Sequence, residues 1–453
     1  MSVHSPRAAS RGTTPDVRQT IAGLLFGLWL AVVPVKFGNP VIFEHILEAP
    51  SNVYEFLLSS WPVAWSYGTL GLVAVAAGLI RRWKTGRLGW LLALPQAWFG
   101  WALLSGTQTV DGRLTQLALL QFAGCIVCFF AGVFGLSELK DFRPVWVGLA
   151  LGLVVILGTA LDQHFGGLER TRIAFENLPP EIRARFDTPE FRRKILSDRI
   201  FGTFIYPNAL AGGVLMLLPV TLAGLRQLGT NAWFKWGLGA GFMAAGLAAL
   251  YWSGSKSGWL IALTMAGLAL CRLPATFRLK ATLFAVLLVV GGLAFLGRHS
   301  SYFERGASSL AARADYWRAA VQMIRQRPIL GYGPGTFMRQ YAALKAPEAE
   351  MARLAHNDYL QQGCDTGLPA MLFYGGFVAA TLLVLLRHGA SSNIHFPIWL
   401  GVFAFAAQGF SEFGLYIPAL AWPFFLFAGW LWGLRMNEFD KPASPSYPPT
   451  PKK

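Results

Sequence analysis

A short polar run just before a long apolar segment carries the side chains best suited to chemistry. His356, Asn357, Asp358 and Tyr359 stand together in it, and Asp365 follows a little further on. A neutral imidazole in such surroundings accepts a proton from an attacking hydroxyl, which predicts His356 as a general base. A plainer interpretation stays open: Asn357 or Asp358 caps a helix, and His356 lies at a membrane interface.

A glycine-rich turn lies upstream of this run. Gly331, Gly333 and Gly335 alternate with other residues, and glycines at such spacing let backbone amides approach a ligand closely. The same pattern suits an ordinary tight turn. It is not a dinucleotide fingerprint, because no strand and helix flank it. We therefore take Gly333 and Gly335 as supporting residues of a site.

The segment 310–327 precedes the turn and is predicted to form a helix that ends before Pro328. Its apolar stripe is expected to comprise Leu310, Tyr316 or Trp317, Ala320 or Val321, and Ile324. Arg313 and Arg318 are among the basic residues of the same helix.

The composition indicates which scaffold positions these groups. Of 453 residues, 54% are hydrophobic and only 14% are charged, and there are 34 Phe and 17 Trp. Soluble domains carry roughly 25% charged residues and could not bury so much apolar surface. Four cysteines and a low charge density exclude a disulfide scaffold and intrinsic disorder. The fold class is therefore predicted to be all-α, as a polytopic membrane protein.

About twelve apolar segments approach the roughly 20 residues that a helix needs to cross a bilayer. They are 20–37, 61–80, 88–105, 114–136, 145–161, 204–225, 234–252, 258–272, 281–297, 367–386, 396–413 and 417–435. The short connection between the seventh and eighth predicts a tight helical hairpin. The chain then consists of a tail at 1–19, a transmembrane catalytic domain at 20–435 and a tail at 436–453.

The net charge of +16 would suggest a nucleic-acid partner in a soluble protein, but here it reports topology. Most of the Lys and Arg residues in the tails and short loops lie on one side of the membrane, which includes both tails. The other side has only Lys36, Arg113 and Lys256. By the positive-inside rule both termini are predicted to be cytoplasmic, with the long loops at about 162–203 and 298–366 outside. The excess charge then faces anionic lipid, and no nucleic-acid partner is predicted.

Several motifs together resemble the signature region of the O-antigen ligase and polymerase superfamily. They cover about 199–370. The downstream ones are Arg313-x-x-x-Trp317, Pro328-x-Leu-Gly331-x-Gly333-Pro-Gly335-x-Phe337 and His356-Asn357-x-Tyr359-Leu360-Gln361. The upstream ones are Arg199-Ile-Phe-Gly202-Thr203 and the hairpin Ser253-x-Ser255-Lys256.

The resemblance implies a C-type membrane glycosyltransferase that works without metal or other cofactor. Such enzymes transfer a glycan from undecaprenyl diphosphate to a hydroxyl on the periplasmic face of the bacterial inner membrane. A ligase uses a lipid A core glycolipid as acceptor, and a polymerase uses another lipid-linked glycan. We expect a ligase, with a polymerase as the alternative because both bind the same donor. Attachment of glycans to protein hydroxyls is a third possibility in the superfamily.

Position in the motifs assigns the expected roles. His356 matches the base, Arg313 the arginine of the R-x-x-x-W motif, and Arg199 the arginine before G-T-F. Lys256 stands where the family usually has arginine, so the charge is kept but the bidentate geometry is not. Asp365 stands where glutamate is common.

Cations are needed to stabilise the negative charge that develops on the diphosphate leaving group. We expect Arg313 to act with His356, and Arg199, Lys256 and Arg318 to bind the diphosphate. Asn357, Tyr359, Asp365, Gly333 and Gly335 are expected to support the site. Interfacial snorkelling of the basic side chains is the alternative interpretation. Inversion at the anomeric carbon is expected, because no carboxylate is clearly placed as a nucleophile.

A small-anion transporter is the alternative from another class of protein. Ion-coupled transporters usually keep ionisable groups near mid-membrane and use broken helices in repeated halves. The predicted spans contain almost no charge at depth, Glu412 lies near an outer end, and the two halves show no repeat. These features favour the enzyme.

Overall fold

The computed structural model describes residues 16–46, 49–83, 89–177, 180–181, 196–304, 308–347, 349–388 and 394–439. Within these ranges the chain forms helices and turns, with one isolated bridge between Gly38 and Phe204. The predicted all-α class is confirmed. Much of the first predicted long loop, 182–195, lies outside the described residues.

Every predicted span contains a helix. In chain order these are α1 (Val17–Lys36), α3 (Val63–Ile80), α4 (Ala93–Gly106), α5 (Gly112–Phe134), α6 (Arg143–Asp162), α10 (Pro207–Gln227), α11 (Ala232–Ser253), α12 (Lys256–Arg272), α13 (Phe277–Glu304), α17 (Leu368–His388), α18 (His395–Gln408) and α19 (Pro418–Phe439). The connections carry α2 (Val53–Leu58), α7 (Leu168–Glu176), α14 (Ser308–Gln326), α15 (Phe337–Leu344) and α16 (Asp358–Thr366), with short 3-10 turns.

Seven helical stretches in the described ranges are long and apolar enough to cross a membrane. They are Val17–Lys36, Val63–Ile80, Gly112–Glu138, Arg143–Ile173, Pro207–Gln227, Phe277–Ser300 and Leu368–Leu386. Helices α4, α12 and α18 have 14, 17 and 14 residues and fall short in length. The chain is thus a multi-pass membrane protein, while the number of twelve spans stays a prediction.

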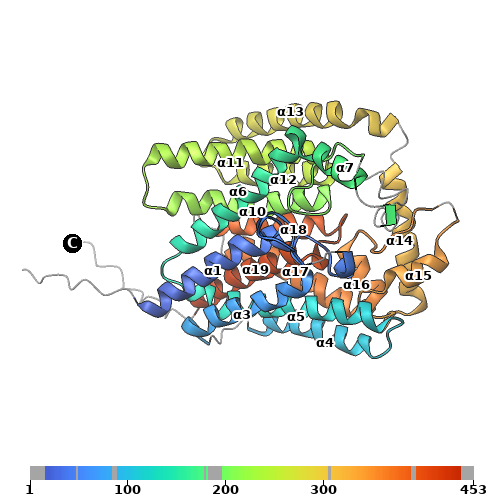
Figure 1. Ribbon diagram of the computed structural model, residues 1–453. Helices are drawn as coiled ribbons and strands as arrows, with labels where there is room; N and C mark the ends of the chain where they lie inside the picture. The colour runs from blue at the N-terminus through green and yellow to red at the C-terminus, as the bar shows by residue number, and fades with distance from the viewer. Residues whose placement is uncertain are drawn as a thin grey trace, which may run out of the picture.

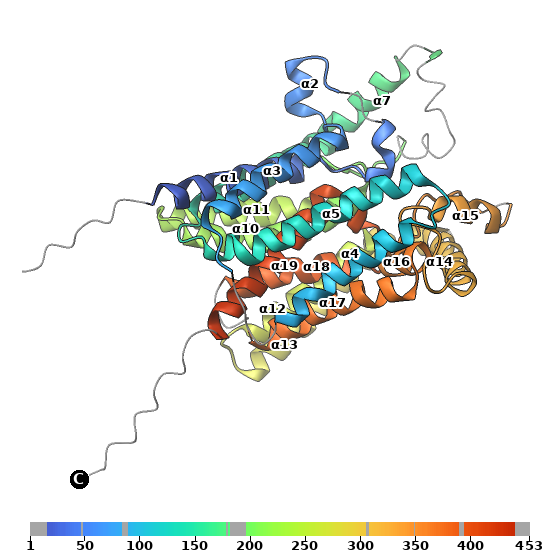
Figure 2. The ribbon, with the colours of Figure 1, turned by 90° about the horizontal axis from the view of Figure 1, so that it is seen from below.

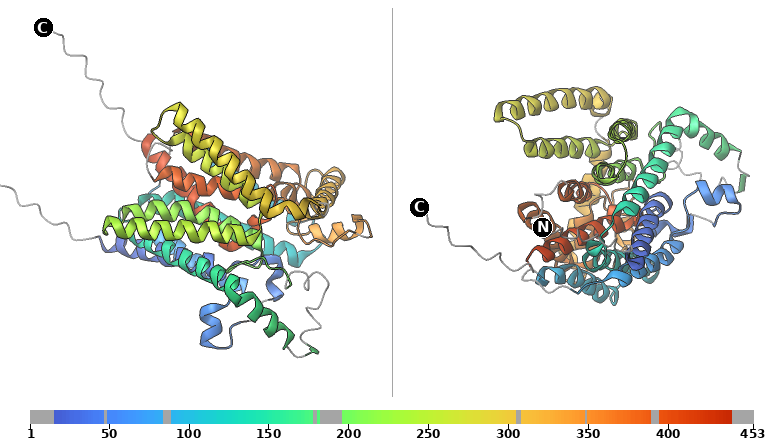
Figure 3. Two further views of the ribbon diagram at one scale, coloured as in Figure 1. Left: turned by 90° about the horizontal axis from the view of Figure 1, so that it is seen from above. Right: turned by 90° about the vertical axis from the view of Figure 1, so that its left-hand side faces the viewer.

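The long helices lie side by side and run between two ends of one bundle (Figures 1 and 2). Figure 2 shows that α1 begins and α19 ends at one end, whereas α7, α14, α15 and α16 gather at the other. Helix α19 passes through the middle, and its residues Ala419–Ala428 are almost all fully buried. Helix α13 lies at the edge (Figure 3), with many exposed apolar side chains that suit contact with lipid.

Glycines let the central helices approach closely. A Cβ on Gly429 of α19 would lie 2.0 Å from the carbonyl oxygen of Phe129 in α5. One on Gly148 of α6 would lie 2.0 Å from the carbonyl oxygen of Gly27 in α1. Backbone contact at small residues is how membrane helices pack where apolar burial supplies no driving force between them.

The predicted hairpin is confirmed. Helix α11 ends at Ser253 and α12 begins at Lys256. Gly254 closes α11 with a left-handed φ of 59°, which glycine adopts without strain. The side chain of Ser255 then accepts a hydrogen bond from the Gly258 amide at 3.2 Å and caps α12.

The first long loop begins differently from the prediction. Instead of ending near residue 161, α6 runs into a kinked π-helical turn, Gln163–Gly167, and α7 follows it. The kink lies at Phe165 and Gly166, whose backbone angles are not helical, with a φ of 117° at Gly166. The buried Gln163 side chain accepts hydrogen bonds from the amides of Phe201 and Gly202 and donates one to the Gly202 carbonyl. These three bonds fix the segment that follows Arg199 against the end of α6.

Candidate active site

His356 is held in an unusual backbone conformation at the end of the bundle opposite to the start of α1. Its φ of 50° is the only positive value found for a non-glycine residue in the described ranges. Such a conformation is costly and persists only where the surroundings impose it, most often at functional sites. The imidazole stacks on Tyr316 of α14 at 5.7 Å and meets Phe413 edge-on at 4.7 Å.

The N-cap of helix α16 directly follows His356 and fixes the position of its backbone. Asn357 is the N-cap, and its Oδ1 accepts hydrogen bonds from the amides of Tyr359 and Leu360 at 3.0 Å each. Its Nδ2 donates to the carbonyl oxygen of Phe410. The predicted cap is confirmed, and it is compatible with a chemical role for His356 because it orients the residue. The Tyr359 hydroxyl donates to the Ala406 carbonyl oxygen at 2.8 Å, so it anchors α16 to α18.

Glu412 is the centre of a polar network that the sequence did not predict. Its Oε2 lies 3.4 Å from Nδ1 of His356, within ion-pair range. Its Oε1 accepts hydrogen bonds from Arg313 and from Nδ2 of Asn208, at 2.5 Å each. Nε of Arg313 also donates to the Ser411 carbonyl oxygen. One buried carboxylate thus joins the predicted base to a predicted cation.

The environment keeps Glu412 charged. Burial alone would raise the pKa of this carboxyl, but hydrogen bonding to His356 and the positive charge of Arg313 outweigh it, so the pKa lies below its usual value. An ionised Glu412 with Oε2 at 3.4 Å favours a proton on Nδ1 and so leaves Nε2 of His356 as the proton acceptor. That is the tautomer a general base requires.

Asn208 extends the network to Arg199. Its Oδ1 accepts a hydrogen bond from Arg199 at 2.7 Å, while its Nδ2 donates to Glu412. Nε of Arg199 donates to the carbonyl oxygen of Ser253 at the α11 hairpin. Burial, together with the like charges of Arg298 and Arg313, lowers the pKa of Arg199 to about 10. The guanidinium is still charged at neutral pH, in a site that disfavours a positive charge without an anion.

Two further cations lie close by. Lys256, in the first turn of α12, is within electrostatic reach of Arg199, Arg298 and Arg313. Arg298, near the end of α13, lies 5.4 Å from the centre of the Tyr251 ring. The structure therefore brings Arg199, Lys256 and Arg313 together as the motifs predicted, and it adds Arg298.

Arg318 does not join this cluster. Its side chain is 76% exposed and forms an ion pair with Asp315 at 2.7 Å, one turn earlier on α14. The expected apolar stripe of this helix was also partly wrong, since Leu310 is 57% exposed and Val321 37% exposed. The buried face runs instead through Tyr316, Ala319, Ala320 and Met323. This rotation about the helix axis carries Arg318 to the solvent side.

Asp365 supports the glycine turn and does not contact His356. Its Oδ2 accepts hydrogen bonds from the Gly335 amide, the Gln361 side chain and the Tyr416 hydroxyl. Its backbone carbonyl oxygen accepts from the Tyr332 and Gly333 amides. The amides of Gly333 and Gly335 therefore bind Asp365, and their left-handed φ values of 107° and 77° explain the glycines. Burial raises the pKa of Asp365 to about 7.

Sequence reasoning missed Glu412 as a site residue, although a signal was present. Glu412 is the only acidic residue between Asp365 and Glu438, in an otherwise apolar stretch. A lone carboxylate in such a stretch is costly and usually has a specific partner.

The described part of the chain offers no evidence for a metal site. Among the residues that the structure describes, no group of three or more His, Cys, Asp or Glu side chains could hold an ion.

The fold and the network define the class of protein. It is a multi-pass helical membrane protein in which a histidine, a carboxylate and several cations lie together at one end of the helix bundle. Residues 241–375 match the family model described as O-antigen ligase. The matched region contains Lys256, Arg313 and His356, whereas Arg199 and Glu412 lie outside it. This matched region is similar to the O-antigen ligase family, as its motifs suggested. No curated protein matches the chain.

Proposed function

We propose that the chain transfers a glycan from undecaprenyl diphosphate to an acceptor hydroxyl at the periplasmic face of the bacterial inner membrane. We propose specifically an O-antigen ligase, with a lipid A core glycolipid as acceptor. The observation that carries this proposal is the contact of Glu412 with both His356 and Arg313. It unites a base and a cation in one buried network, as displacement of a diphosphate by a hydroxyl requires.

His356 acts as the base in this scheme. Nε2 takes the proton of the acceptor hydroxyl while the hydroxyl oxygen attacks the anomeric carbon of the donor glycan. The bond from that carbon to the diphosphate oxygen breaks, and its electron pair leaves with undecaprenyl diphosphate. Positive charge then grows on the imidazole, and Glu412 stabilises it. The distance of 3.4 Å between Nδ1 and Oε2 is of the kind that shortens when substrate binds.

The cations stabilise the leaving group. Arg199, Lys256, Arg298 and Arg313 form a cluster in which burial and mutual repulsion already lower the pKa of Arg199. A diphosphate bound there relieves the repulsion, and its charge increases as the glycosidic bond breaks. Cations held in place before the reaction therefore favour the transition state over the free reactants.

The network also supports inversion. Both oxygens of Glu412 are occupied, Oε1 by Arg313 and Asn208 and Oε2 by His356. Such a carboxylate is unsuited to act as a nucleophile, so a single displacement follows, with inverted configuration. The location of the network, at the bundle end away from the start of α1 and the end of α19 (Figure 2), agrees with a periplasmic site if both termini are cytoplasmic.

Reconstitution tests the proposal. The purified protein in lipid nanodiscs is supplied with an undecaprenyl diphosphate glycan and a lipid A core acceptor, and products are identified by mass spectrometry. We expect one glycan on each acceptor, inverted configuration and an equal amount of released undecaprenyl diphosphate. Chain extension of the donor without acceptor would instead identify a polymerase. Absence of both products from active-site-intact protein would refute glycosyl transfer.

A further inference from the structure

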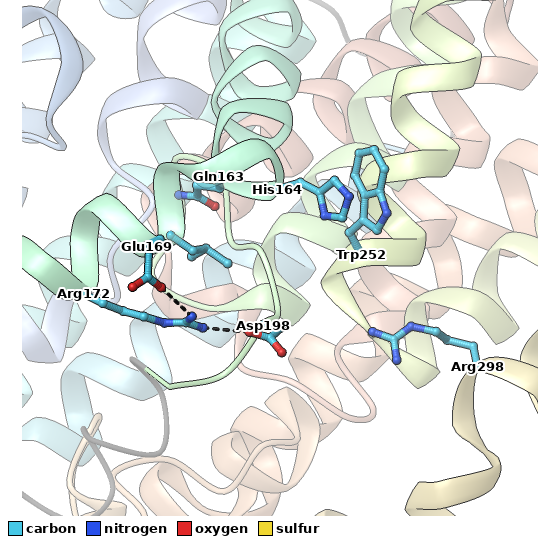
Figure 4. Close-up of a pocket in the computed structure, with 9 residues that line it drawn as sticks. Gln163, His164, Glu169, Arg172, Asp198, Trp252 and Arg298 are labelled. Carbon is cyan, nitrogen blue, oxygen red and sulfur yellow. Dashed lines mark hydrogen bonds and ion pairs between the residues drawn. The ribbon is translucent and has the colours of Figure 1, made fainter.

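A cavity of about 350 Å³ lies beside the cation cluster, where the π-helical turn after α6 meets α7 and the ends of α11 and α13 (Figure 4). Its size falls in the range of roughly 300–1,000 Å³ that small-molecule sites occupy. Of the residues that line it, the transfer mechanism uses only Arg298. Its lining includes Asp198, which directly precedes Arg199, and Trp252, which lies just before the α11–α12 hairpin.

One wall of the cavity is aromatic. His164 of the π-helical turn stacks on Trp252 of α11, with ring centres 3.7 Å apart and planes 11° from parallel. Figure 4 shows the two rings together on one side of the cavity. The backbone of Trp252 is fixed as well, because its carbonyl oxygen accepts a hydrogen bond from the Ile200 amide. The wall is therefore a flat, rigid surface formed before any ligand binds.

The opposite wall presents two carboxylates in fixed positions. Arg172 donates to Oε2 of Glu169 at 3.0 Å and to Oδ1 of Asp198 at 2.8 Å (Figure 4). The Arg172 side chain is only 21% exposed, whereas those of Glu169 and Asp198 are 61% and 94% exposed. The guanidinium thus aligns both acids and leaves their outer oxygens accessible to hydroxyl groups.

Arg298 completes the lining. Its Nε is buried and makes no hydrogen bond to any residue that the structure describes. Such a buried donor is costly unless something accepts from it. With Arg172 it balances the charges of Glu169 and Asp198, so these four groups of the lining sum to zero formal charge.

We propose that this cavity binds an uncharged sugar ring of a glycan substrate, an inference that rests on the proposed function. One face of a pyranose carries C–H groups that pack on a flat aromatic wall, while its edge carries hydroxyls for the carboxylates of Glu169 and Asp198. A ring oxygen or hydroxyl accepts from the guanidinium of Arg298, which lines the cavity. The balanced charge disfavours a phosphate, which the neighbouring cluster around Arg199 suits better.

The sugar comes from one of two sources with the same chemistry. Asp198 and Arg199 are consecutive in the chain, so a ring in the cavity lies next to the cations proposed to hold the diphosphate. It belongs either to the donor glycan or to the acceptor glycan. Kinetics distinguishes the two, because loss of a binding contact raises the KM of the substrate that makes it.

Direct binding is measured first, since it does not depend on transfer. Saturation-transfer NMR on the protein in nanodiscs uses methyl glycosides of glucose, galactose, rhamnose and N-acetylglucosamine at millimolar concentration. We expect at least one to receive saturation from the wild-type protein. The signal should fall in Asp198→Asn and Trp252→Ala and persist in the controls Asp141→Asn and Trp233→Ala. Asp141 forms an exposed ion pair with Arg143 away from the cavity, and Trp233 is 85% exposed.

Transfer kinetics then identifies the source. In Asp198→Asn we expect the KM of one glycan substrate to rise about tenfold, as the loss of a hydrogen bond to a charged group predicts, with kcat little changed. A rise for the donor alone assigns the ring to the donor, and a rise for the acceptor alone assigns it to the acceptor.

Two results would overturn the inference. One is saturation transfer that is absent in the wild type or unchanged in both cavity variants. The other is unaltered KM for both substrates in a transferring enzyme. A protein that binds glycosides through Asp198 yet transfers nothing would retain the sugar site and refute the proposed function alone.

Discussion

Replacing Glu412 by glutamine separates two roles of this side chain. One is to bind Arg313 and Asn208, and the other is to orient His356. The amide keeps the shape of the carboxylate but has one acceptor and one donor. If its oxygen takes the place of Oε1, it still accepts from Arg313 and Asn208, and its NH₂ group faces Nδ1 of His356. In the reverse orientation the NH₂ group would face Arg313 and Nδ2 of Asn208, which are both donors. The first orientation is therefore favoured.

The expected magnitudes follow from this geometry. Hydrogen bonds to charged groups contribute about 1.5–3 kcal/mol and neutral ones about half as much. The folding loss in Glu412→Gln should thus be about 1–3 kcal/mol. The catalytic loss is larger: Nδ1 of His356 must now accept, so Nε2 carries the proton and cannot act as base. We expect kcat to fall by about 10²–10⁴-fold, the contribution of general base catalysis.

The assay is glycosyl transfer in nanodiscs at saturating substrates, with thermal unfolding measured in parallel. The control is Asp111→Asn, which removes a carboxylate that binds Arg339 at 2.7 Å but does not contact His356. It should lose a similar amount of stability and keep kcat. If Glu412→Gln retained the wild-type kcat, or if Asp111→Asn lost as much activity, Glu412 would not orient the base.

Three further outcomes are expected. Lys256→Arg should keep or raise activity, because a guanidinium binds diphosphate at least as well as an ammonium; complete loss in a normally folded variant would contradict diphosphate binding at this position. The pKa of Asp365 is raised to about 7 by burial, so the wild type binds an extra proton on folding. Its melting temperature relative to Asp365→Asn should decline as pH rises from about 4 to 7 and then level off; a constant difference would contradict this burial effect. Gly333→Ala should lose about 1–3 kcal/mol, since its Cβ would lie 2.2 Å from Oγ1 of Thr109 at a φ of 107°, whereas Gly292→Ala, with open space, should melt like the wild type.

The sequence predicted those features that depend on neighbours along the chain. Apolar runs located a helix in each of the predicted spans, and the hairpin and the Asn357 cap followed from local patterns. The motifs also brought together Arg199, Lys256 and Arg313, because the family resemblance carries three-dimensional information that single residues lack.

Features set by long-range packing were missed. Glu412 meets Arg313 and Asn208 across about 100 and 200 positions of sequence, and no local pattern encodes such a pairing. Arg318 was misplaced because the helical stripe allowed two rotations, and packing against α16 chose the one that exposes it. The continuation of α6 into a π-helical turn depends on Gln163 binding the segment near Gly202.

His356 is proposed to be the base of a glycosyl transfer, and His356→Ala tests this role most directly. Transfer from an undecaprenyl diphosphate glycan is followed over a single turnover, with His395→Ala, at the start of α18, as control. We predict a rate lower by about 10²–10⁴-fold in His356→Ala, with donor binding retained and the control unaffected. Transfer at the wild-type rate in a folded His356→Ala protein would contradict the account.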